Sequence, residues 1–120
     1  MRSPTAVVQA QLDAYNAKDI DALLATYAPD AIQYALHGEI LAHGHAQIRE
    51  RFLARFQEPD LHARLIARTV TGNVVVDTEI ITRNFPKGKG TVEMLCIYEV
   101  VGETIARASF VTGEKVLFAS

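Results

Sequence analysis

Residues 74–101, VVVDTEIITRNFPKGKGTVEMLCIYEVV, form the stretch that decides the fold. Apolar and polar residues alternate in both arms, the period-2 pattern of strands that bury one face. Between the arms lies Pro86-Lys87-Gly88-Lys89-Gly90, a composition typical of a turn. The segment therefore predicts an antiparallel hairpin of strands 74–85 and 91–101.

Strand parity predicts which residues share a face. The face predicted to cover the helices carries the even-numbered residues of both arms: Val76, Thr78, Ile80, Thr82, Val92, Met94, Cys96, Tyr98 and Val100. The opposite face mixes apolar and charged residues: Val75, Asp77, Glu79, Ile81, Arg83, Glu93, Leu95, Ile97 and Glu99. We expect this second face to point outward, toward solvent or a second subunit.

The segments on either side of the hairpin complete an α+β layout. Strand candidates span residues 61–71 and 104–112, and the turns at Gly72-Asn73 and Gly102 favour antiparallel connections. Toward the N-terminus, Ser3-Pro4 begins a helix that runs to about Ala17, and Asp19 caps a short second helix. A third helix starts at about His45, with a short strand over 31–36 and a loop over 37–43 before it. The prediction is three N-terminal helices packed on a curved antiparallel sheet.

Length and composition restrict the class of protein. The chain has 120 residues, 49% of them hydrophobic and 22% charged, which predicts one globular domain over residues 1–120. A net charge of -2 without a basic cluster argues against nucleic acid. A single cysteine cannot form an internal disulfide or, alone, a zinc site. No apolar run approaches the ~18 residues of a membrane span, and we expect a cytoplasmic protein with no membrane partner.

Several ordered stretches resemble the nuclear transport factor 2-like superfamily, in particular its SnoaL-like and ketosteroid-isomerase-like branch. They are Val8-Gln9 through Asp21, Tyr27-Ala28-Pro29-Asp30-Ala31, Gly44-His45-Ala46-Gln47-Ile48-Arg49, Ile97-Tyr98-Glu99-Val100, Gly102 and Ile105-Ala106-Arg107. The resemblance implies a cone-shaped SnoaL-like domain that encloses an apolar pocket for a small molecule, usually as a homodimer. Members include isomerases, cyclases, dehydratases, hydrolases and pure binding proteins, so the fold alone does not assign a function.

The resemblance does not supply the residues of a standard ketosteroid isomerase. Such an enzyme uses a carboxylate base together with a tyrosine and a protonated aspartic acid as oxyanion donors. Our alignment puts Ala35 at the base, Gln11 at the tyrosine and Cys96 at the acid. Alanine accepts no proton and a thiol is a poor donor. We therefore expect steroid double-bond isomerisation to be absent or very slow.

His37 is the candidate catalytic residue. On a strand over 31–37, Gln33, Ala35 and His37 share one side, so the imidazole can face the pocket near the position of the missing base. A histidine there suits general acid/base catalysis near neutral pH. The competing interpretation is a loop histidine at the mouth of the pocket.

Other candidates belong to the wall of the pocket. Gln11 and Tyr15 lie four residues apart on the first helix and can orient a carbonyl or hydroxyl, although Tyr15 also suits the core. Substrate-binding positions on the sheet are expected at Thr78, Met94, Cys96, Tyr98 and Phe110, with Gln33 and Ala35 on the first strand. Cys96 is expected to be a small buried residue without a cationic partner.

Two further groups suggest chemistry but have simpler explanations. His43 and His45 flank Gly44, yet no carboxylate accompanies them, and polar residues around a helix start explain them better than a metal. Asp77, Glu79, Glu93 and Arg83 look like an acid/base cluster, and epoxide hydrolases of the superfamily use an Asp-Arg-Asp site. Because parity points these side chains away from the helices, we predict cross-strand ion pairs instead.

Two functional hypotheses follow. The first is an enzyme of isomerase or cyclase type that moves a proton on a mostly apolar, carbonyl-bearing compound without a metal or cofactor, through His37 with Gln11 and Tyr15. The second is a non-catalytic binding or scaffold domain with the same pocket. In either case we expect a homodimer built on the outer face of the sheet, through Val75, Ile81, Leu95 and Ile97.

Overall fold

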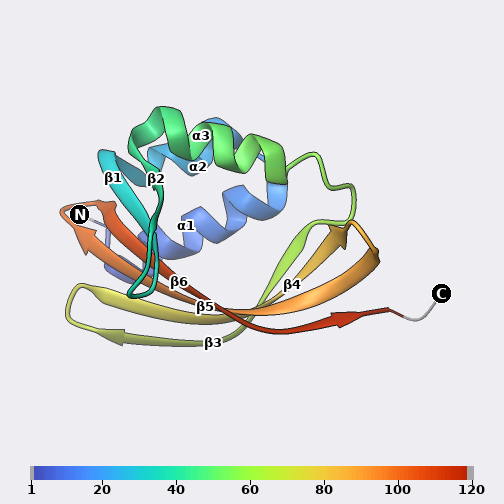
Figure 1. Cartoon of the computed structure of the whole chain (residues 1–120). Coiled ribbons are helices and arrows are strands. Elements are labelled where there is room, and N and C mark those ends of the chain that lie inside the picture. Colours follow the sequence, from blue (N-terminus) through green and yellow to red (C-terminus); the bar gives the residue numbers. More distant parts are fainter. Residues whose placement is uncertain (1, 119–120) are drawn as a thin grey trace.

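A computed structural model describes residues 2–118, in which helices cover one face of a curved sheet (Figure 1). The helices are α1 (Pro4–Ala17), α2 (Ile20–Ala25) and α3 (Gly44–Arg55). The strands are β1 (Tyr27–Ala35), β2 (Ile40–His43), β3 (His62–Thr71), β4 (Val74–Phe85), β5 (Gly88–Val101) and β6 (Thr104–Leu117). The predicted α+β fold, with its N-terminal helices on a curved sheet, is confirmed.

The sheet is mixed rather than wholly antiparallel. Its strand order is β2-β1-β6-β5-β4-β3, and β1 pairs with β6 in parallel while the other pairs are antiparallel. No turn joins β1 to β6, so nothing local in the sequence indicates their direction. The short strand β2 lies where we predicted a loop. The sequence did not indicate it, because its four residues are mostly exposed and show no alternating pattern.

Local signals explain where the first two helices begin and end. The Ser3 hydroxyl accepts a hydrogen bond from the Ala6 amide, and Pro4 occupies the first turn of α1. Lys18 ends α1 in the left-handed region, with φ 55°. The Asp19 carboxylate then accepts from the Ala22 amide and starts α2. These caps fix the first residue of each helix and the end of α1.

The register of the β4–β5 hairpin reverses our prediction for β4. Phe85 pairs with Gly88 across a two-residue turn, so Asp77 lies opposite Cys96 and Glu79 opposite Met94. A five-residue loop over 86–90 would have paired even with even residues, whereas the observed turn pairs odd residues of β4 with even residues of β5. Gly90 lies in the strand, paired with Arg83, and a glycine is needed there because a Cβ would collide with the Val116 carbonyl oxygen of β6. The prediction that Asp77 and Glu79 point outward is therefore wrong.

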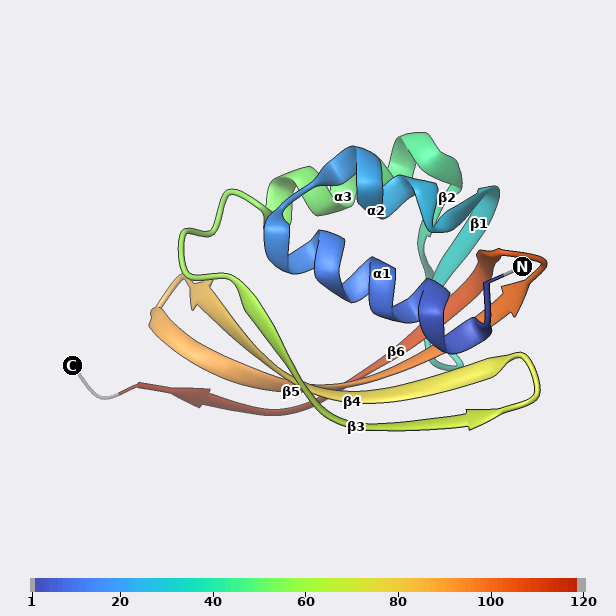
Figure 2. The ribbon, with the colours of Figure 1, turned by 180° about the vertical axis from the view of Figure 1, so that it is seen from behind.

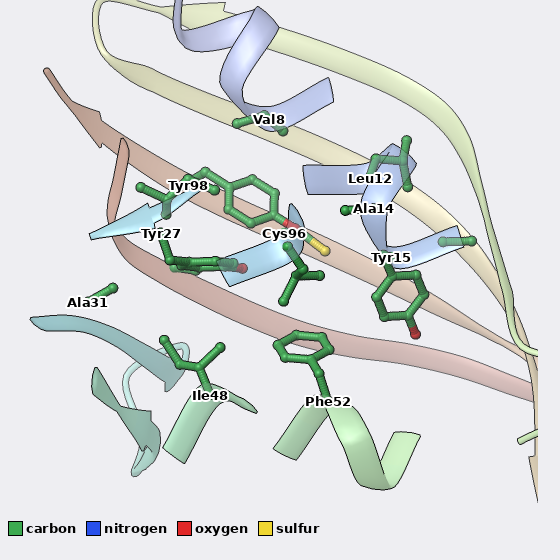
Figure 3. Close-up of a cluster of buried hydrophobic side chains, with 14 of the residues drawn as sticks. Val8, Leu12, Ala14, Tyr15, Tyr27, Ala31, Ile48, Phe52, Cys96 and Tyr98 are labelled. Carbon is green, nitrogen blue, oxygen red and sulfur yellow. The ribbon is translucent and has the colours of Figure 1, made fainter. Parts of the chain in front are cut away.

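Figure 2 shows the helix layer lying over the curved sheet, and the interior between them is built from side chains of both layers (Figure 3). Figure 3 shows Tyr98 and Cys96 of β5 beside Tyr27 of β1, with Ile48 and Phe52 of α3 across from them. Val75 and Ile81 of β4 are also buried, so half of the surface predicted for dimerisation is core instead. Among the apolar residues assigned to that surface, Leu95 and Ile97 are partly exposed, and the oligomeric state stays a prediction.

Candidate functional site

A cavity of about 360 Å³ lies between α1, α3 and strands β4–β6. This volume is within the usual range of small-molecule sites, about 300–1,000 Å³. The helices contribute Gln11, Leu12, Tyr15, Arg51, Phe52 and Arg55 to its wall. Strand β4 contributes Glu79, Ile81, Arg83 and Phe85. The remaining wall comes from Val92, Met94, Cys96 and Tyr98 of β5 and from Phe110, Thr112 and Lys115 of β6.

The structure brings together six of the residues predicted to form the site. Those that line the cavity are Gln11, Tyr15, Met94, Cys96, Tyr98 and Phe110. Thr78 does not, because the register of β4 turns it to the outer face of the sheet, where it lies opposite Leu95. Ala35, paired with Phe110 at the end of β1, is not part of the cavity wall either.

His37 lies outside the cavity. Strand β1 ends at Ala35, and His37 follows in the exposed turn before β2, with a left-handed φ of 55°. The strand that we extended through residue 37 therefore stops two residues too early to aim the imidazole inward. The alternative interpretation, a histidine in a loop, describes this position.

Gln33 is fully buried and reaches the cavity indirectly. Its amide oxygen accepts a hydrogen bond of 2.7 Å from Nη1 of Arg51, and the Arg51 side chain lines the cavity. Gln33 thus positions a cation rather than contacting a ligand itself.

Glu79 lines the cavity, although strand parity predicted that its carboxylate points away from the helices. Its side chain is only 4% exposed, yet it faces the cavity, and it forms no ion pair with any residue in 2–118. Burial, together with repulsion from Asp77, raises the pKa of Glu79 to about 7, while the Cys96 thiol and Arg68 oppose that rise. The Cys96 thiol donates to Oε1 of Glu79 at 3.7 Å. A carboxyl group with such a pKa is populated in both protonation states at neutral pH.

Asp77 lies two residues before Glu79 and is fully paired. Nε and Nη2 of Arg68 donate to its two carboxylate oxygens at 2.7 and 2.9 Å. Nη1 of Arg68 also donates to Oε1 of Gln9 at 2.8 Å, which ties β3 and β4 to α1. Because every arm of this guanidinium is occupied, the pair is structural and Glu79 has no cation in direct contact.

Neutral polar groups complete the end of the cavity near Glu79. The Tyr98 hydroxyl donates to Oε1 of Gln11 across 3.4 Å. The Gln11 amide nitrogen and the Tyr15 hydroxyl make no hydrogen bond within residues 2–118, and neither atom is fully buried. Burial raises the pKa of Tyr15 and of Tyr98, so both phenols are protonated. Donors are thus available to a carbonyl oxygen placed beside Glu79.

Four cationic side chains line the rest of the cavity. Arg55 and Arg83 share the Glu58 carboxylate, at 3.1 and 2.8 Å. Arg51 and Lys115 form no ion pair within the described part of the chain. Burial, followed by repulsion from Arg55, lowers the pKa of Arg51. The cavity is therefore apolar in its walls and positive in its charge balance.

The remaining predictions concern Cys96 and the histidines. Burial raises the pKa of the Cys96 thiol well above its ordinary value, and no cation opposes this, as expected of a small buried residue. His45 makes a 2.8 Å hydrogen bond to the Tyr27 carbonyl oxygen. Within residues 2–118, no three His, Cys, Asp or Glu side chains gather into a group able to hold a metal ion.

Glu79 and Arg51 line the cavity, but neither is among the residues that the sequence predicts for the site. Glu79 was recognised as a titratable group but was assigned to the wrong face, and the length of the hairpin turn was the signal that decided it. Arg51 was not considered, because a basic residue on an amphipathic helix is ordinarily solvated. Its position next to Phe52, at the edge of the apolar stripe of this helix, is the sequence feature that could have indicated a partly buried arginine.

These observations define an α+β protein with a ligand-sized cavity between its helices and its curved sheet. The model of the SnoaL-like domain matches residues 8–108. The chain belongs to the SnoaL-like domain family. No curated protein matches it significantly in sequence.

Solved structures share the fold at low sequence identity. An uncharacterised cystatin-fold protein from Novosphingobium aromaticivorans is 24% identical with a TM-score of 0.86, over 92% of this chain and 99% of that one. A putative polyketide cyclase from Sinorhizobium meliloti is 24% identical with a TM-score of 0.72, over 88% and 93%. A putative ketosteroid isomerase from Kribbella flavida is 15% identical with a TM-score of 0.79, over 98% and 82%.

No helix within residues 2–118 is long and apolar enough to cross a membrane.

Proposed function

We propose that this protein binds a small, mostly apolar carbonyl compound in the cavity and transfers a proton at the carbon next to the carbonyl. The observation that carries the proposal is Glu79, a buried carboxyl group without an ion pair that faces a ligand-sized cavity. Glu79, rather than His37, takes the role of general acid/base. The family and the enzyme names of two structural neighbours support the same class of function.

The proposed step uses groups that are already in place. The ionised Glu79 carboxylate removes a proton from the α-carbon, so that a C–H bond breaks, an O–H bond forms and the electron pair moves into an enolate. The charge that develops on the carbonyl oxygen accepts hydrogen bonds from the Gln11 amide or the Tyr15 hydroxyl. Glu79 then returns a proton to the carbon skeleton, at the same or at a conjugated position. A pKa near the working pH suits both halves of this transfer.

Exchange of α-hydrogen for deuterium tests the proposal without knowledge of the natural substrate. 2-Tetralone, a neutral bicyclic ketone with acidic α-hydrogens, is incubated in D₂O, and deuterium incorporation is followed by proton NMR. We expect the wild-type protein to accelerate exchange over buffer, and Glu79→Gln to lose about 10²–10⁴ of that acceleration, the usual contribution of a positioned base. Glu93→Gln is the matched control, because Glu93 is an exposed carboxylate on β5.

The pH profile provides a second readout. The groups around Glu79 are Asp77 on β4, Arg68 on β3, Cys96 and Tyr98 on β5, and Tyr15 on α1. Because the base must be ionised, the exchange rate should rise with pH and level off above about 7. No acceleration by the wild type, or equal rates for wild type and Glu79→Gln, contradicts the proposal and favours the alternative, a binding domain of the same fold without chemistry.

A further inference from the structure

The cavity wall opposite Glu79 contains a cation, Arg51, that forms no ion pair with a carboxylate within residues 2–118. Arg51 projects from α3, whereas Glu79 projects from the sheet, so the two groups approach a ligand from different layers. Within residues 2–118, the polar contact of the Arg51 guanidinium is the hydrogen bond from Nη1 to Gln33. Four of its five N–H groups therefore have no acceptor among the residues that the structure describes.

Arg51 is also held in a fixed position. Its guanidinium carbon lies 5.3 Å from the ring centroids of both Phe52 and Phe110, within the range of cation–π contact. Gln33, which holds Nη1, is itself fully buried in β1. A guanidinium clamped by two rings and one amide loses little conformational freedom when a ligand binds. Arg51 is thus a partly buried cation that has no carboxylate partner within the described residues.

The other cations of the cavity leave the same excess. Glu58 is shared between Arg55 and Arg83, and the exposed Lys115 contacts the Phe85 ring at 4.8 Å and forms no ion pair within residues 2–118. Glu79 cannot balance Arg51 by contact, because the two make no ion pair. An organic anion supplies the missing charge, whereas a neutral steroid or hydrocarbon does not.

We propose that the cavity takes an aromatic or otherwise apolar carboxylate, whose charged group is bound by Arg51 and whose body lies among the aromatic side chains toward Glu79. This inference rests on the proposed function in one respect, since it names the class of its substrate. The planar fork of Arg51 can donate two parallel hydrogen bonds to a carboxylate. Phe52 and Phe110, whose rings both lie 5.3 Å from the guanidinium carbon, then contact the adjoining ring.

Binding of a matched pair of probes tests the proposal. 2-Naphthoate and 2-naphthamide have nearly the same shape but differ in charge, and their dissociation constants are measured by isothermal titration calorimetry. We expect the wild type to bind the naphthoate at least tenfold more tightly than the naphthamide. Arg51→Met should abolish that preference while leaving the naphthamide affinity within about twofold. Arg49→Met is the matched control, because Arg49 lies on the same helix but is exposed and pairs with Asp21.

Arg51→Lys is a second variant, which keeps the proposal testable if Arg51→Met does not fold. The lysine keeps the charge but loses the fork, so a partial preference of a few fold should remain. A merely structural Arg51 would change stability and both affinities together, not their ratio. Equal binding of the two probes by the wild type, no saturable binding of the naphthoate, or a preference that survives Arg51→Met would overturn the proposal.

The two proposals fail separately. Glu79→Gln should retain the preference for the naphthoate while it loses exchange of 2-tetralone, a neutral ketone. If the protein catalyses Glu79-dependent exchange of 2-tetralone but does not prefer the naphthoate, only the proposed substrate class is wrong. A preference for the anion without Glu79-dependent exchange removes the catalytic step and leaves a binding site for organic anions.

Discussion

Asp77 and Glu79 are neighbours on the same face of β4, but they belong to two differently built regions of the interior. Around Asp77, under α1, a bidentate arginine and an amide satisfy every charge. Around Glu79, two residues along the strand, the acid contacts only a thiol, and the arginine on the opposite wall contacts only an amide. Since both acids are buried, the difference lies in pairing: Asp77 is a structural carboxylate, and the unpaired Glu79 is the one we propose to be reactive.

Breaking the paired region should give the largest loss of stability. Asp77→Ala leaves the partly buried Arg68 without its counter-charge, so we expect a decrease of about 3–5 kcal/mol in the free energy of unfolding. Urea denaturation measures it, with Glu99→Ala as the control, since the Glu99–Arg107 pair is exposed and 3.9 Å long. The double variant Asp77→Leu with Arg68→Met should recover most of the loss. A loss below about 1 kcal/mol for Asp77→Ala would show that the pair is not the structural element described.

Removing the carboxylate charge at Glu79, by contrast, should increase the stability of the folded protein. Its pKa is about 7 in the folded state, against an ordinary 4.5, so folding favours the protonated form. The folded protein loses stability as pH rises from about 4.5 to 7, and Glu79→Gln removes that loss. We expect the variant to be more stable than wild type by up to about 3 kcal/mol at pH 8, and by almost nothing at pH 4.5.

Thermal unfolding of both proteins at the two pH values measures this difference. Glu93→Gln is again the control, because an exposed carboxylate has little desolvation to relieve. A Glu79→Gln variant that is less stable than wild type at pH 8 would mean that the carboxylate has a stabilising partner. Stability gained together with activity lost is the signature of a group that is buried for its chemistry.

The contrast between the two acids also shows what the sequence could and could not predict. Period-2 alternation and helix caps are local, so the helices, the long strands and the inward face of β5 could all be predicted. The face of β4 could not be predicted as securely, because it depends on whether residues 88–90 are counted as turn or as strand. One odd difference in loop length moved Asp77 and Glu79 from the surface to the interior.

The Arg51 site was beyond local patterns for a different reason. Its partners come from α3, β1 and β6, which are distant in the sequence, and the pairing of β1 with β6 is itself invisible to turn signals. Six predicted positions nevertheless line the cavity, because they lie on α1, β5 and β6, where the alternation was assigned correctly. His37 was misplaced because the end of a strand is the part that a pattern defines least.

A smaller effect is expected at the boundary of the two regions, where Tyr98 meets Gln11. Their hydrogen bond spans 3.4 Å, at the long end of the useful range. Tyr98→Phe removes the donor but leaves Gln11 facing the cavity, so we expect a loss of only about 0.5–1.5 kcal/mol. The naphthoate preference should not change, because Arg51 is untouched. Chemical denaturation and the same titrations check both statements, and a loss above 3 kcal/mol would contradict the weak bond.

The smallest effect should come from removing the Tyr27 hydroxyl. This change tests whether the polar groups behind Arg51 lack hydrogen-bond partners, as those around Glu79 do. The Tyr27 ring is buried, and burial raises the pKa of its hydroxyl, with the Gln33 amide partly opposing. Neither the Tyr27 hydroxyl nor Nε2 of Gln33 makes a hydrogen bond of good geometry within residues 2–118. Removing a buried hydroxyl without a proper partner relieves a desolvation cost instead of breaking a bond. Tyr27→Phe should therefore change the free energy of unfolding by less than about 1 kcal/mol, in either direction. If Tyr27→Phe alone costs more than 2 kcal/mol, the hydroxyl is fully satisfied, and the region behind Arg51 is as well paired as the one around Asp77.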